Sequence, residues 1–328
     1  MTLSYLLKLV CLGLASFFLV HLALGLVVGA ATPLVLRMAA RARPALAARL
    51  LFFIRMFPAG FGVLIVAGLC VPSYLWLEPK TATSEGIGWL CLGFSMLTVL
   101  LWAAAIRRGV LAMARSIRYL QLCHRNGRQT EVPGESLPVW VVEEPAALFA
   151  MAGITHPSLL ISHQAMSALS MDQLAAALRH ERAHWTSRDN LKRLLLLLAP
   201  GMLPFLHGFG TLERSWARYT EQAADDRAVA GDVGRSLSLA TALVNVSRLG
   251  IAQRASSLVA PLLAGDDDLA ARVQRLLTAA PQADNASGGW MGCLITGAVV
   301  MLSAGVIAIG LQPALLYPVH RFLEHLIQ

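Results

Sequence analysis

Charged residues are scarce in this 328-residue sequence, at 14% of the chain against 56% hydrophobic residues. That balance is too apolar for an ordinary soluble enzyme. The formal charge of +8 could indicate a nucleic-acid partner. However, the arginines cluster beside apolar runs, and no nucleic-acid motif accompanies them. We therefore expect a membrane protein that contacts the lipid bilayer and binds no nucleic acid.

The cysteines are also too few and too widely separated to indicate a disulfide framework or a metal site. The chain has five, an odd number. Only Cys123 falls in a polar region, and the other four lie inside apolar runs: Cys11, Cys70, Cys91 and Cys293. Neither a disulfide framework nor a cysteine-based metal site is indicated.

Long apolar runs are what the sequence has instead. Four are long enough to cross a bilayer core of about 30 Å: residues 9–36, 56–77, 87–106 and 290–311. The first run exceeds the apolar core of a cleavable signal peptide. It contains His21, and an ionisable residue inside a membrane is a functional candidate unless it merely packs between helices.

The arginines predict the orientation of these spans. Five lie between the first two runs: Arg37, Arg41, Arg43, Arg49 and Arg55. The next connector, residues 78–86, has a single cation, Lys80. Because short cytoplasmic loops carry the excess of Lys and Arg, we expect the first loop and the region after Arg107 in the cytoplasm. This gives three regions: spans one to three in 1–108, a cytoplasmic domain in 109–288, and the fourth span with a short tail in 289–328.

The polar region contains a pattern with chemical meaning. His180 and His184 are four residues apart, so on a helix both imidazoles leave the same face and can converge on one metal ion. Glu181 is turned about 100° away, too far to be a third ligand. It is close enough to take a proton from a metal-bound water. This is the HExxH arrangement of zinc hydrolases.

A second helical run, residues 219–230, offers the missing ligand. Zinc in a hydrolase takes three protein ligands and leaves the fourth position to water. Glu221 can complete a His-His-Glu set for Zn²⁺. Asp225 shares the helix face of Glu221 and can accept a hydrogen bond from a ligand imidazole, which would orient that ring. Asp226 is predicted to be solvated.

These motifs resemble the BlaR/MecR-type membrane metallopeptidases, gluzincins related to the prenyl-protein and heat-shock membrane proteases. The resemblance covers roughly residues 138–277 and rests on the motifs at 180–184, 188–195 and 221–225 and on the approach segments 145–153 and 157–162. It implies a zinc-dependent endopeptidase with ligands His180, His184 and Glu221 and the base Glu181. Antibiotic-sensing members continue into an extracytoplasmic penicillin-binding domain; this chain stops at Gln328, so we expect that sensor to be absent.

The rest of the polar region is predicted to be mainly helical. Residues 139–142 and 159–161 predict short strands that frame a cleft and offer an edge to an extended substrate. Residues 191–209 are apolar but contain Pro200, Gly201 and Pro204. A full crossing there would separate the His pair from Glu221, so we expect a membrane-resting or re-entrant pair of helices. For Arg272 we consider two roles at the site, a salt-bridge partner of an acid and an electrophile for the oxyanion, against the alternative of an arginine on a solvated helix face.

The sequence thus predicts a mainly α, polytopic membrane protein whose zinc-peptidase domain contains a few short strands. Its expected function is cleavage of a protein or peptide near the cytoplasmic membrane surface, with a signalling role as an extension. One alternative is a catalytically silent signalling or scaffold protein that keeps the fold. The other is a metal transporter, which nearly bare spans argue against. The sequence leaves homo-oligomerisation open.

Overall fold

The computed structural model describes residues 3–78, 87–130, 138–143, 149–154, 158–201, 208–249, 260–261, 266–278 and 289–327. Residues 79–86 of the connector after the second span, residues 145–148 of the approach segment 145–153 and residues 202–207 of the apolar stretch lie outside these ranges. Within the described residues the molecule is mainly helical with one small sheet, and the predicted fold class is confirmed.

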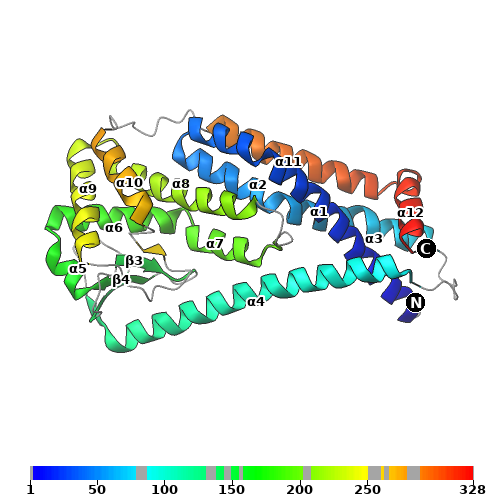
Figure 1. Cartoon of the computed structure of the whole chain (residues 1–328), viewed down its shortest axis with the longest axis horizontal. Coiled ribbons are helices and arrows are strands. Elements are labelled where there is room, and N and C mark those ends of the chain that lie inside the picture. The colour runs from blue at the N-terminus through cyan, green and yellow to red at the C-terminus, as the bar shows by residue number, and fades with distance from the viewer. Residues whose placement is uncertain are drawn as a thin grey trace.

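Three long rods of helix form the membrane part of the molecule (Figure 1). They are α1 (Leu3–Arg41), α2 (Pro44–Ile65) with its continuation, and α4 (Trp89–Asn126). The continuation is a π-helical turn, η1 (Val66–Cys70), and α3 (Val71–Leu77). At 1.5 Å per residue α1 and α4 are each ~57 Å long, whereas a bilayer core needs about 30 Å. Each rod therefore extends well beyond the membrane.

The turn η1 has a cause in the sequence. Pro72, at the start of α3, has no backbone N–H and cannot continue the ordinary hydrogen-bond ladder. The carbonyl of Gly68, four residues earlier, is thereby released, and the helix widens there instead of ending.

Three helices within the described residues are long and apolar enough to cross a membrane. The fourth predicted span corresponds to α11 (Gly289–Gly310), which is followed by α12 (Pro313–Ile327). These two form a bent pair with an angle of 88°. The expected short tail is thus a helix, and its buried residues Leu316 and Leu323 face the membrane bundle.

The predicted length of the arginine-rich loop between the first two spans is wrong, because most of its residues are helical. Helix α1 continues to Arg41 and α2 begins at Pro44, so only Ala42 and Arg43 separate them. Proline is a good first residue of a helix because its missing N–H would lack an intrahelical partner there anyway. Alanine and leucine then favour helix through the basic stretch.

A five-stranded sheet lies at the other end of the molecule, with the order β1-β2-β4-β3-β5 in the described chain. The strands are β1 (Arg128–Thr130), β2 (Val139–Val142), β3 (Phe149–Ala152), β4 (Ser158–Ser162) and β5 (Ala260–Pro261). Strands β2 and β4 pair in parallel, and the other neighbours pair antiparallel. The two predicted strands exist, but both are interior, so neither offers the edge that we expected to receive a substrate.

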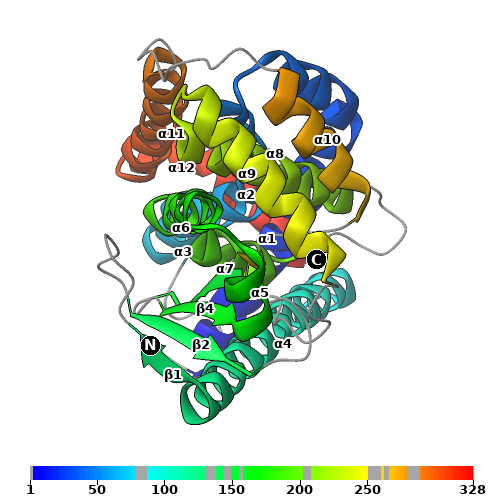
Figure 2. The same ribbon diagram turned by 90° about the vertical axis from the view of Figure 1, so that its left-hand side faces the viewer.

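The two faces of the sheet pack on different helices because side chains alternate along a strand. Phe149 and Met151 face a core formed with α6 (Met171–Thr186) and α9 (Val233–Arg248). Ala150 and Ala152 face Tyr119 and Cys123 of α4. The end-on view shows α4 beneath the sheet, with α6 and α9 on its other side (Figure 2). The last third of α4 is therefore part of the domain that holds the sheet.

Within the described residues, the apolar stretch after the motif helix contains no helix long enough to cross the membrane. It contains α7 (Asp189–Leu198), a helix of ten residues, and α8 (Phe209–Val229) begins eleven residues after α7 ends. Leu194 and Leu198 lie against Gly109 of α4. His21 lies 3.2 Å through Nε2 from the Gly201 carbonyl oxygen and stacks on Phe17. In this structure His21 therefore joins α1 to the chain after α7.

Candidate metal centre

Helix α6 carries both histidines, and its start is well defined. Ser170 accepts a hydrogen bond from the Gln173 backbone N–H, and the Gln173 side chain accepts one from the Ser170 backbone N–H. Such a reciprocal capping box satisfies two otherwise unpaired donors at a helix start. Asp172 adds a negative charge in the first turn, where the helix dipole favours it. The register of His180, Glu181 and His184 is thereby fixed.

The turn after α6 brings an acid to His184. Arg188 has a left-handed backbone with φ of 54°, and α7 begins directly after it at Asp189. The Oδ2 atom of Asp189 accepts a hydrogen bond of 2.9 Å from Nδ1 of His184. Its other oxygen pairs with Lys192 at 3.0 Å. Asp189 thus orients the second imidazole.

Helix α8 supplies two further acids. Glu221 and Asp225 are one turn apart, and both are 1% exposed. The Oδ1 atom of Asp225 lies 3.0 Å from Nδ1 of His180. Asp226 lies on the outer side of the helix and is exposed, as expected for a solvated acid, and it also pairs with Arg275.

Three donor atoms converge between α6 and α8. His180, His184 and Glu221 each offer one ligand atom, and these atoms lie within 4.8 Å of one another. The two Nε2 atoms are 3.1 Å apart. Because each Nδ1 faces a carboxylate, neutral rings carry their proton there and direct their Nε2 lone pairs toward each other. Both oxygens of Glu221 are buried without a hydrogen bond.

This donor set fits a divalent cation. Two facing lone pairs and an unbonded carboxylate repel one another unless a positive charge lies among them. Two imidazole nitrogens and one carboxylate oxygen are the ligands that catalytic zinc uses while keeping a position for water. His180, His184 and Glu221 would hold the ion. Asp225 and Asp189 would keep the two imidazoles in the ligating tautomer.

The electrostatics of the centre follow from burial and from close ion pairs. Burial alone would raise the pKa of Glu221, but His184, His180 and Arg272 outweigh it and hold that pKa well below the ordinary range. Burial would lower the pKa of His184, yet Glu221 and Asp189 raise it to about 10. Without a metal ion, a proton therefore substitutes for the cation among the donors.

Glu181 lies in a different environment. Burial raises the pKa of its carboxyl group, opposed by His180 and His184. One oxygen, Oε2, accepts a 2.7 Å hydrogen bond from the backbone N–H of Met151 in β3, and Oε1 has no hydrogen bond. Asn190 donates to the carbonyl oxygens of Met151 and Gly153, both at 3.2 Å. The sheet thus fixes one oxygen of Glu181 and leaves the other available for a proton.

Two arginines complete the surroundings. Arg272 of α10 (Asp266–Thr278) donates two hydrogen bonds to Asp225, at 2.9 and 2.7 Å, and lies 3.3 Å from Glu221. Of the two roles considered for Arg272, the salt bridge is the one this geometry supports. Arg193 of α7 lies 3.5 Å from Glu221. No role was predicted for Arg193, Asp189, Asn190 or Met151, because each reaches the centre only through the turn at Arg188 or through the sheet.

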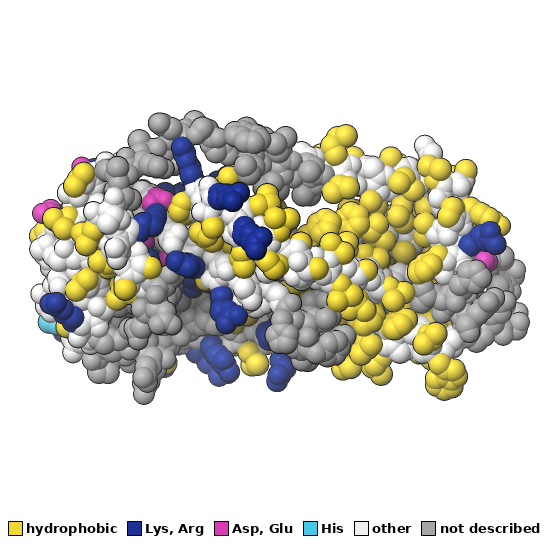
Figure 3. Space-filling view, turned by 45° about the horizontal axis from the view of Figure 1, so that its top comes forward, with side chains coloured by type: hydrophobic (Ala, Val, Ile, Leu, Met, Phe, Trp, Pro, Cys, Tyr) yellow, Lys and Arg dark blue, Asp and Glu magenta, His cyan; other side chains and the backbone are white. Residues whose placement is uncertain are grey.

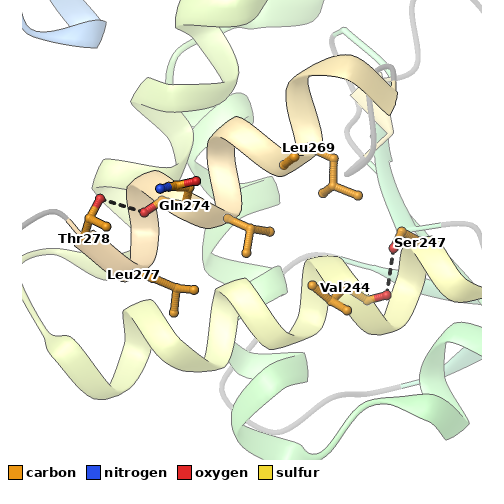
Figure 4. A pocket seen from close by; sticks show the side chains of 8 residues that line it. Val244, Ser247, Leu269, Gln274, Leu277 and Thr278 are labelled. Carbon is orange, nitrogen blue, oxygen red and sulfur yellow. Dashed lines mark hydrogen bonds between the residues drawn. The ribbon is translucent and has the colours of Figure 1, made fainter.

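A cavity of about 630 Å³ lies away from this centre, between α9 and α10 (Figure 4). Val244 and Ser247 line it from α9, and Leu269, Val273 and Leu277 line it from α10. Its hydroxyl groups are bonded to their own helices, as Ser247 is to the Val244 carbonyl. The cavity therefore presents mainly apolar surface and contains none of the groups described above.

Comparison with known sequences agrees with the donor set. Residues 118–275 match the profile of Peptidase family M48, which supports a metallopeptidase of that family. The matched stretch includes all three candidate ligands, Glu181 and both acids that contact the imidazoles. No curated protein matches the chain.

Proposed function

We propose that the chain is a zinc-dependent membrane endopeptidase, which the match of residues 118–275 to Peptidase family M48 supports. We further propose that it is of the BlaR/MecR type, which the motifs at 180–184, 188–195 and 221–225 resemble. The observation that carries this proposal is the buried convergence of His180, His184 and Glu221 beside the carboxyl group of Glu181. Protein or peptide chains are its substrates.

Glu181 is the proposed general base. Zinc, when bound to the three ligands, polarises the scissile carbonyl and lowers the pKa of water. Glu181 takes the proton of the attacking water on its unbonded oxygen and later gives it to the leaving amine. Burial suits this exchange, because it raises the pKa of the carboxyl group toward neutrality. Met151 and Asn190 keep the carboxylate in place while the proton moves.

The proposed working place is the cytoplasmic surface of the membrane. Hydrophobic side chains gather over the half of the molecule that contains the spans, whereas Lys and Arg gather near the boundary and over the other half (Figure 3). Because basic residues mark the cytoplasmic side, the metal centre faces the cytoplasm of a bacterial-type inner membrane. A substrate at that surface suits a role in signalling.

The direct test compares cells that carry the wild type, Glu181→Gln and the matched control Glu143→Gln, whose side chain is exposed. We expect at least one protein fragment in the wild type and the control that is missing with Glu181→Gln, measured by terminal proteomics. The Glu181→Gln protein should retain zinc, because Glu181 is not a ligand. Identical fragment profiles in all three strains would refute the enzyme activity.

The orientation is tested by cysteine labelling in a cysteine-free background. A membrane-impermeant maleimide applied to intact cells should label Ser84→Cys, in the connector after the second span. It should not label Ser238→Cys, which is partly exposed on α9 of the peptidase region. Both sites should react after the cells are opened. Labelling of the Ser238 site from outside would overturn a cytoplasmic substrate.

A further inference from the structure

Arg193 is a cation at the centre without a carboxylate of its own. Its Nη2 atom is 3.5 Å from Oε1 of Glu221, and its side chain is 15% exposed. That contact is longer than a charge-assisted hydrogen bond, which is about 2.7–2.9 Å. The guanidinium group thus lies beside the candidate ligand set and keeps donors for another acceptor.

The other cations at the centre are already engaged. Arg272 is bonded twice to Asp225, and its side chain is 2% exposed. Lys192 pairs with Asp189 at 3.0 Å. Among the described residues that pair with the site acids, Arg193 is therefore the one that has access to solvent and makes no contact as short as a charge-assisted hydrogen bond. The role of electrophile, which was considered for Arg272 from the sequence, therefore suits Arg193 better.

The balance of positive and negative charge at the centre also indicates that Arg193 has a further anionic partner. Glu181, Asp189, Glu221 and Asp225 contribute four negative charges when ionised. Lys192, Arg193, Arg272 and one divalent ion contribute five positive charges, and ligating imidazoles are neutral. One positive charge is left over in a largely buried place, where uncompensated charge is unfavourable. An anion with a single negative charge would balance it.

We propose that Arg193 is the electrophilic catalytic residue of the peptidase, an inference that rests on the function proposed above. As water adds to the scissile carbonyl carbon, the C=O π pair moves to the carbonyl oxygen and a water proton moves to Glu181. Arg193 donates an N–H hydrogen bond to that oxygen as its negative charge develops. When the C–N bond breaks, the pair returns to C=O, and Glu181 passes its proton to the amine.

This role predicts an effect on the chemical step rather than on substrate binding. A donor that strengthens only as charge develops lowers kcat when it is removed, with little change in KM. Loss of one oxyanion donor typically lowers kcat by roughly 10²- to 10³-fold. An arginine that held a substrate carboxylate would instead raise KM, and one that only neutralised Glu221 would change metal retention.

The test uses the full-length protein in detergent with the variants Arg193→Gln and Arg193→Lys. Arg182→Gln is the matched control, because Arg182 is an exposed arginine beside the same motif. Zinc content and the thermal unfolding midpoint are measured first. The cobalt-substituted proteins are then titrated with inorganic phosphate and followed by their visible spectrum. Finally, kcat and KM are measured with fluorescent β-casein.

We expect Arg193→Gln to retain zinc, to bind phosphate at least about 10-fold more weakly and to lower kcat by about 10²-fold or more at similar KM. Arg193→Lys should recover part of both effects, and Arg182→Gln should match the wild type. Unchanged phosphate affinity, loss of zinc or an effect on KM alone would overturn the role of Arg193. Equal casein rates in the wild type and Glu181→Gln would count against the proposed function instead, and the phosphate titration would still decide on Arg193.

Discussion

The spans and the metal centre solve the problem of buried polar groups in opposite ways. In the spans the polar groups are mostly hydroxyls that bond to backbone carbonyls. Ser95 donates toward Cys91 of its own helix and Cys11 of α1, both at 2.7 Å. At the centre the polar groups are charged, and Asp189, Glu221 and Asp225 each have a cation or an imidazole within 4 Å. The membrane part therefore depends on close packing, and the centre depends on charge balance.

This contrast predicts where a substitution acts. The hydroxyl group of a serine or threonine in a span donates a hydrogen bond to a carbonyl oxygen of its own helix. Its removal should therefore lower the free energy of unfolding by only about 0.6–2 kcal/mol. An acid at the centre cannot be removed alone, because its partner is then buried with an uncompensated charge. The predictions below test this difference, from the largest expected effect to the smallest.

Removing the imidazoles should abolish metal binding. We expect about one zinc per chain in the wild type and essentially none in the double variant His180→Ala/His184→Ala, because one carboxylate cannot hold the ion alone. Glu221→Ala should also lose most zinc. Metal is measured by mass spectrometry after gel filtration. Stoichiometric zinc in the double variant would exclude this centre as the zinc site.

The charge network should tolerate loss of both partners better than loss of one. Asp225→Asn leaves the Arg272 guanidinium buried without its carboxylate, at a cost of about 3–5 kcal/mol. It should also weaken zinc affinity by about 10- to 100-fold, because the orientation of His180 is lost. Adding Arg272→Met should restore stability but not zinc affinity. Thermal unfolding and competition with a chelator measure the two effects, and equal stability of the single and double variants would contradict charge balance.

Packing in the membrane part is most sensitive where α11 crosses η1. A Cβ atom added to Gly310 would collide with the carbonyl oxygen of Gly68, which is backbone and cannot move aside easily. Gly310→Ala should therefore lower the unfolding midpoint, with an expected cost of roughly 1–3 kcal/mol. Zinc stoichiometry should be unchanged. The control is Gly305→Ala on the same helix, where an added Cβ meets nothing within 4 Å. Equal effects of both variants would contradict close packing at Gly68.

Zinc binding should release about one proton at pH 7. In the metal-free protein the pKa of His184 is raised to about 10 by Glu221 and Asp189 despite burial, so this proton must leave before the imidazole can bind metal. Because the folded pKa exceeds the unfolded value, the proton stabilises the metal-free fold below about pH 6.5 and this contribution is lost as pH rises toward 10. Calorimetry in buffers of different ionisation enthalpy measures the release, and a value near zero would contradict the raised pKa.

Contacts between residues of one helix could be predicted from the sequence, whereas contacts across a turn could not. The spacing of His180 and His184 lies within one helix, where four residues define a face, so the structure has them side by side as expected. Asp189 is only five residues further, but the left-handed turn at Arg188 ends the helical periodicity. The spacing of residues along the chain therefore does not predict that Asp189 contacts His184.

Strand β3 was missed for a different reason. Its sequence is Phe149-Ala150-Met151-Ala152, and three of these four residues, the two alanines and the methionine, favour helix more than strand. Pairing with β4 and burial on both faces override that preference. Consequently the contact between the backbone of Met151 and Glu181 could not be predicted from the sequence.

The length of α4 has a mechanical consequence. It runs without a break from the far end of the membrane part to β1, and its last turns are packed against the sheet whose strand β3 contacts Glu181 (Figure 1). The segment beyond the bilayer is ~25 Å long at 1.5 Å per residue. A change of about 5° in the tilt of α4, of the kind that bilayers of different thickness impose, displaces its far end by ~2 Å. Helix α4 therefore couples a segment of ~30 Å in lipid to a segment of ~25 Å that packs against the sheet whose strand β3 contacts Glu181.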